Sequence, residues 1–148
     1  FSVVGVSAQY DENPPPSFSH HFGSAPVNVN FEGFDYDELE AEAKYFEEEE
    51  GRTMNGKIRF QDFNFFNKAS VEVTADGTEI WRLHFHADGA QAVNVYFNNF
   101  HLPQGSGLWI YNEEGTFFDG PHSTEENNDH GQFMTNTVFG EDLVLEYV

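Results

Sequence analysis

The sequence predicts a mainly β domain: an antiparallel β-sandwich of jelly-roll type with one short helix near its N-terminus. Apolar and polar residues alternate in several segments after residue 70, a pattern typical of strands with one buried face. Gly-containing turn signals such as Asp76-Gly77 and Asp88-Gly89 separate these segments. Aromatic residues make up 17% of the chain, and large rings suit a core that forms between two sheets.

The first thirty residues are expected to precede the domain itself. Residues 1–8 (FSVVGVSA) have the small-x-small ending of a signal-peptide remnant, which would make Gln9 the mature N-terminus. A short β-strand is the alternative for this valine-rich stretch. Residues 9–30 contain three consecutive prolines and are predicted to be an extended leader. A single domain is then expected over residues 31–148.

An acidic helix is predicted over residues 35–50. Its start can be capped by Asp35 or Asp37, and its end carries the run from Glu47 to Glu50, which opposes the helix dipole and should fray the last turn. Its apolar positions recur at the spacing of one helix face: Leu39, Ala43 and Phe46. Strands are predicted over 70–74, 79–87, 92–100, 108–112, 116–119, 132–138 and 143–148.

The strand over 79–87 places two histidines on one face. Its side chains alternate between an apolar set and a polar set, the latter being Arg82, His84 and His86. If this strand pairs with 92–97 across the Asp88–Gln91 turn, His84 and His86 face Asn94 and Tyr96. Two histidines at i and i+2 on an exposed face can bind Zn²⁺ or Cu²⁺, so both are candidate ligands, with a solvated strand face as the alternative.

The turns between residues 111 and 131 offer a second group of candidate ligands. Ca²⁺ binds hard oxygen ligands in irregular loops, although hydrophilic turns without an ion are the alternative. The candidate residues are Asn112, Asp119, Asn127 and Asp129. Apart from Ca²⁺ here, no cofactor is expected.

Charge and composition exclude several classes of function. The chain has 26 acidic and 6 basic residues, a net charge of −20, and such a field repels nucleic acid and anionic membranes. Nothing approaches the roughly 20 apolar residues needed to span a bilayer. There is no cysteine, and no nucleophile elbow, P-loop or zinc-protease motif, so the chain is not expected to be an enzyme.

The order of several short segments resembles a known class of domain. These segments are Trp81–Leu83, Phe100–Gly105, Ile110–Asn112, Gly120–Asn127 and Gly140–Tyr147, after a Pro15-Pro16-Ser17-Phe18 leader. Together they resemble the N-terminal non-catalytic β-domain, or pro-domain, of secreted bacterial trypsin-like, lysyl-endopeptidase-type serine proteases. His84 and His86 depart from the basic or polar residues common at those positions.

The resemblance implies an exported accessory domain or pro-domain of a serine protease precursor. It would assist folding of a downstream catalytic domain or restrain its activity, and that domain, with the catalytic residues, would lie beyond Val148. Arg82, His101 and Trp109 are the expected contacts with the protease or with another protein surface.

Two other functions remain compatible with the sequence. An extracellular carbohydrate-binding or adhesion module would need an exposed aromatic platform, for which Tyr96, Trp109 and Tyr111 are candidates. A self-assembling surface subunit would use the N-terminal arm to lend a strand to a neighbour, which would make the protein an oligomer. All of these interpretations place the protein outside the cell or at its surface.

Overall fold

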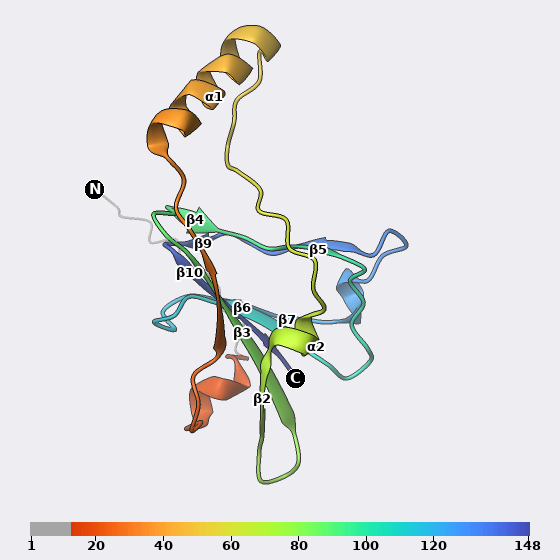
Figure 1. Cartoon of the computed structure of the whole chain (residues 1–148). Helices are drawn as coiled ribbons and strands as arrows, with labels where there is room; N and C mark the ends of the chain where they lie inside the picture. Colours follow the sequence, from red (N-terminus) through yellow and green to blue (C-terminus); the bar gives the residue numbers. More distant parts are fainter. Residues whose placement is uncertain (1–12) are drawn as a thin grey trace, which may run out of the picture.

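The protein is a mainly β chain with one long helix, as the computed structural model shows for residues 13–148 (Figure 1). The predicted signal-peptide remnant, residues 1–8, lies outside these described residues. Across the described part of the chain, no helix is both long and apolar enough to cross a membrane.

The largest sheet is organised around β3 (Glu79–Ala87). On one side β3 pairs antiparallel with β10 (Asp142–Tyr147), and the sheet continues through β6 (Leu108–Tyr111) to β7 (Phe118–His122). On its other side β3 has two partners in succession, β2 (Ser70–Val73) antiparallel and β1 (Val27–Phe31) parallel. The parallel β1–β3 pair corrects the prediction of a wholly antiparallel sheet.

The predicted Asp76-Gly77 hairpin joins β2 to β3. Gly77 adopts a φ of 87°, a left-handed conformation that glycine tolerates best. The Thr74 N–H donates to the Thr78 carbonyl at 2.9 Å and closes the turn.

A two-stranded ribbon lies over one face of the large sheet. It consists of β4 (Ala92–Val93) paired with β9 (Val138–Phe139), and β5 (Tyr96–Asn98) paired with β8 (Gln132–Met134). Between the two pairs, Thr135 bonds to the backbone of Val95 through both its N–H and its hydroxyl. The expected pairing of 92–97 with 79–87 is therefore wrong, because β10, β2 and β1 occupy both edges of β3.

The main hydrophobic core lies between the large sheet and this ribbon. The sheet contributes alternate residues of β3, β6 and β10, and Val138 comes from the ribbon, with Val93, Val95, Phe97 and Phe133 partly buried against it. The buried sheet residues are Leu83, Phe85, Leu108, Ile110, Leu143 and Leu145. Burying a side chain of this size stabilises the fold by about 1.5–3 kcal/mol.

The opposite face of the large sheet is covered by the N-terminal segment. Pro15 is buried there, Pro16–Ser19 form a 3-10 helix (η1), and Phe18 packs edge-on against Tyr111 at 5.1 Å. The Ser17 N–H donates to the buried Glu146 carboxylate at 2.9 Å. Residues 13–31 are thus part of the folded unit, whereas the sequence suggested an extended leader up to residue 30.

The helix α1 (Tyr36–Glu50) stands away from the sheets, and the chain returns from it as an irregular segment (Figure 1). The Asp35 carboxylate accepts the N–H groups of Asp37 and Glu38, as the capping signal predicted. The glutamate run remains helical despite the expected fraying. Gly51 adopts a left-handed conformation after it, and the Arg52 N–H donates to the Phe46 carbonyl at 3.0 Å.

Two further short helices complete the described chain. They are α2 (Phe65–Lys68), capped by Asn64, and the 3-10 helix η2 (Thr124–Glu126), capped by Ser123.

Candidate metal centre

Two histidines of β3 and one aspartate of β10 meet on the large-sheet face that points away from the main core. In the register of these strands, Asp142 lies opposite His86, and Val144 lies opposite His84. Because alternate residues of a strand share a face, all four side chains lie on the same face.

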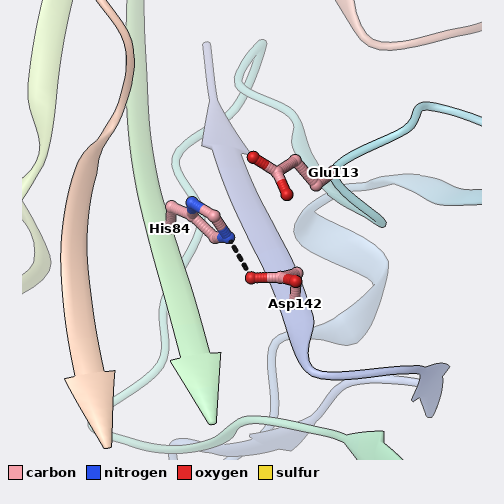
Figure 2. A group of neighbouring side chains, drawn as sticks. All are labelled: His84, Glu113 and Asp142. Carbon is pink, nitrogen blue, oxygen red and sulfur yellow. Dashed lines mark hydrogen bonds and ion pairs between the residues drawn. The ribbon is translucent and has the colours of Figure 1, made fainter. Parts of the chain in front are cut away.

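One oxygen of Asp142 binds both imidazole rings. Its Oδ1 atom lies 2.8 Å from His84 Nε2, the contact drawn in Figure 2, and 2.7 Å from His86 Nδ1. An ionised carboxylate can only accept hydrogen bonds, so each ring donates through that nitrogen. The two rings are therefore oriented by a common partner.

The centre extends from the protein interior to the surface. The His84 side chain is 9% exposed, that of Asp142 25% and that of His86 35%. The predicted solvated face is thus wrong for His84, which is buried. An ion could reach the centre from the side of His86.

Two glutamates bring further carboxylates to the same place. Glu113, in the turn between β6 and β7, points toward His84 and Asp142 in Figure 2, and the ligand atoms of these three residues lie within 4.8 Å of one another. The ligand atoms of His86, Glu141 and Asp142 meet the same limit. The two histidines thus fall in different groups of three, and Asp142 belongs to both.

Local hydrogen bonds hold both glutamates in position. The Asn112 side chain bonds to the Thr116 hydroxyl at 2.7 Å and to the Phe117 N–H at 2.9 Å, which fixes the turn that carries Glu113. Glu141 directly precedes Asp142, and its Oε1 atom accepts the Gly89 N–H at 2.7 Å. The backbone segments that carry Glu113 and Glu141 are therefore held in a defined conformation beside the histidines.

The electrostatics of the centre favour the binding of cations. Burial raises the pKa of Asp142, but hydrogen bonds from His86 and His84 outweigh this and leave the pKa below its usual value. The hydrogen bond to Asp142 raises the pKa of His86, with smaller contributions from the charges of Glu141 and Asp88. Asp142 therefore remains ionised and attracts cations over the neutral pH range.

Imidazole nitrogen combined with carboxylate oxygen is a ligand set that Zn²⁺ accepts, at distances of about 2.0–2.2 Å. To bind an ion through these nitrogens, a neutral ring would move its proton to the other ring nitrogen, and a protonated ring would release one proton. The arrangement can therefore hold a divalent transition metal, with Asp142 as the shared anchor.

Sequence reasoning identified only part of this centre. His84 and His86 were predicted ligands, but they face β10 rather than Asn94 and Tyr96. Asp142, Glu113 and Glu141 were missed. The available signal was the alternation of β10, which places Asp142 on the polar face if β10 pairs with β3.

Three of the predicted Ca²⁺ ligands have hydrogen-bond partners within the protein, and the fourth faces solvent. Asp119 contacts His122 at 3.0 Å and accepts the Asn136 amide, whereas Asn127 bonds to the backbone of Leu102. Asn112 braces its own turn, and Asp129 is exposed. Within residues 13–148, neither Asp119 nor Asp129 joins a group of three His, Cys, Asp or Glu side chains that could hold a metal ion.

The predicted partner contacts differ in accessibility. Arg82 is buried, donates to the Ser24 carbonyl at 3.0 Å and lies over the Phe22 ring. Trp109 is buried and donates to the Asn13 carbonyl at 3.0 Å. Of the three, only His101 is exposed. Of the aromatic platform candidates, Tyr96 is exposed, while Trp109 and Tyr111 are buried.

Comparisons of the chain with protein-family models, curated proteins and solved structures find no match.

Proposed function

We propose that this chain is a non-catalytic β-domain that binds a divalent transition metal, represented by Zn²⁺, at Asp142. The observation that carries the proposal is the convergence of two imidazole rings on one carboxylate oxygen, at 2.8 and 2.7 Å, with a further glutamate beside each ring. Surface acids gather by chance in a chain with this much negative charge, whereas two histidines, one of them buried, share a single carboxylate oxygen far less readily.

The bound ion would tie together parts of the chain that are distant in sequence. Its ligands come from β3, from β10 and from the turn after β6, so occupancy favours the folded state over the unfolded chain. A ligand that binds only the folded state stabilises it by mass action. An accessory domain exported into a metal-containing medium would thereby gain stability without disulfides, for which it has no cysteine.

Isothermal titration of Zn²⁺ into the EDTA-treated and dialysed full chain tests this proposal. We expect saturable binding by the wild type and its loss in Asp142→Asn. Asp129→Asn removes the same charge from an exposed position and should bind as the wild type does. Absence of saturable binding by the wild type, or equal binding by Asp142→Asn, would contradict the proposal.

A second function that we propose for the same domain is that of an exported accessory or pro-domain of a serine protease precursor, built as a jelly-roll-like β-sandwich. The projecting α1 favours it: none of its residues is buried, it is rich in glutamate, and Tyr36 and Tyr45 are 65% and 57% exposed. An acidic, partly aromatic arm suits docking to a basic protein surface and would speed the encounter at low salt.

Inhibition kinetics test this second function. The purified chain is added to a secreted trypsin-like protease of the lysyl-endopeptidase type, with and without 0.5 M salt. We expect reversible inhibition that weakens in salt, and a weaker effect after replacement of Glu47–Glu50 by glutamine. Unchanged protease activity at a large molar excess of the chain would contradict it.

A further inference from the structure

We propose that the centre binds two divalent ions, bridged by the carboxylate of Asp142. One ion would be held by His84 and Glu113 and the other by His86 and Glu141, each together with Asp142. This inference rests on the proposed metal binding and extends it from one ion to a pair.

The grouping of the ligand atoms is the first support. His84, Glu113 and Asp142 meet the 4.8 Å limit as one group, and His86, Glu141 and Asp142 meet it as another. No group that includes both histidines occurs within residues 13–148. Asp142 is thus the only ligand common to two sets that are otherwise separate.

The geometry around Asp142 is the second support. Its Oδ1 atom contacts His84 Nε2 and His86 Nδ1 at nearly equal distances, so the carboxylate lies between the two rings. A carboxylate in this position can give an oxygen to each of two ions, which in paired-metal sites lie about 3.5–4 Å apart. In the strand register Asp142 lies directly opposite His86 and diagonally from His84, on the same face of the sheet, so both rings are within its reach.

Charge balance is the third support. The two sets together contain three carboxylates, namely Asp142, Glu113 and Glu141, and two neutral imidazoles once the ring protons are displaced. One divalent ion would leave this set with a charge of about −1 and two would leave it with about +1, so the three carboxylates can balance most of the charge of a second ion. Near the centre, Asp88 adds a negative charge that acts on His86, and Arg82 adds a positive charge on the same face of β3. Placing two cations close together is therefore less costly here than in a neutral site.

The number of protein ligands predicts how each ion would be coordinated. Each would have three protein ligands, which leaves at least one coordination position for water. Glu113 is exposed and the His86 side chain is 35% exposed, so solvent can reach both ions.

Native mass spectrometry of the full chain, loaded with Zn²⁺ and dialysed, tests the inference. We expect two ions on the wild type, one on Glu113→Gln, one on Glu141→Gln, and none on Asp142→Asn. Glu114→Gln, an exposed neighbour in the same turn, should retain two. Circular dichroism of every variant verifies its fold.

A second measurement needs no variant. With Mn²⁺ as the probe, a bridged pair gives an exchange-coupled electron paramagnetic resonance spectrum, distinct from the six-line spectrum of an isolated ion. A single ion on the wild type, or two ions without exchange coupling, would overturn the two-ion inference and leave the metal-binding proposal standing. No ion at all would overturn both.

Discussion

The hydroxyl of Tyr111 on β6 donates a 2.9 Å hydrogen bond to the carboxylate of Glu146 on β10, and Glu146 is completely buried. The other carboxylate oxygen accepts the Ser17 N–H. Burial first, and then the charge of Glu146, raise the pKa of Tyr111 above its ordinary value, so its hydroxyl keeps its proton. This network fastens the N-terminal segment to the sheet.

Tyr111→Phe should therefore lower the free energy of unfolding by about 1–3 kcal/mol, because a buried carboxylate oxygen loses its donor. Urea unfolding monitored by tryptophan fluorescence measures the change. Tyr96→Phe is the matched control, since Tyr96 is 55% exposed, and its effect should stay within about 0.5 kcal/mol. Equal effects of the two substitutions would show that the hydrogen bond contributes nothing.

The metal centre predicts a thermal shift that depends on one histidine. At Zn²⁺ concentrations about a hundredfold above the dissociation constant, binding adds about 2.7 kcal/mol to the stability. For a chain of this size, that is roughly 5–10 °C in Tm. His86→Ala should reduce the shift clearly, and His101→Ala, which removes an exposed histidine, should keep it in full. Differential scanning fluorimetry compares the variants, and a full shift in His86→Ala would exclude this ligand.

Glu126 predicts a pH-dependent contribution to stability. Burial raises its pKa, but the Ser123 N–H and the His122 ring outweigh this and hold it below the ordinary value of 4.5. Because the folded-state pKa is depressed, the stabilisation is present above the unfolded-state pKa and is lost as pH falls through the folded-state pKa.

Glu126→Gln should thus cost about 1 kcal/mol at pH 5.5 and progressively less as the pH is lowered below 4.5. Urea unfolding between pH 3 and 5.5 measures the difference. Glu125→Gln, in the same helical turn but exposed, should show little difference throughout. A cost for Glu126→Gln that does not change with pH would refute this assignment.

A close approach at Gly107 predicts a steric effect. A Cβ atom at this position would lie 2.6 Å from Trp109 Cη2 and 2.7 Å from its Cζ3, and Trp109 is buried and cannot easily move. Gly107→Ala should therefore destabilise the fold by about 1–3 kcal/mol. In Gly56→Ala the new Cβ meets nothing within 4 Å, so the effect should be small. Calorimetric Tm values that fall equally for both variants would rule out this explanation.

Features that depend on neighbouring residues were predictable from the sequence. Asp35 caps α1, the apolar residues of α1 recur at the spacing of one helix face, and Asp76-Gly77 closes the β2–β3 hairpin. In each case the interaction that forms the element joins residues only a few positions apart, so the local sequence contains the information.

Strand pairing was not predictable in the same way. The turn after β3 suggested a hairpin with 92–97, yet β3 pairs with β10, more than fifty residues later, and also with β1 in parallel. Alternation tells which residues share a face but not which strand lies alongside, since several strands of similar length and polarity compete for each edge.

In the candidate metal centre, one feature follows from the local sequence and the others follow from strand pairing. The sequence by itself determined that His84 and His86 share one face of a strand, because side chains alternate along any extended backbone. Only the tertiary structure decided that Asp142 lies between them, that Glu113 and Glu141 join them, and that His84 is buried. Those contacts depend on the order and register of strands distant in the chain, which the burial of the common core selects.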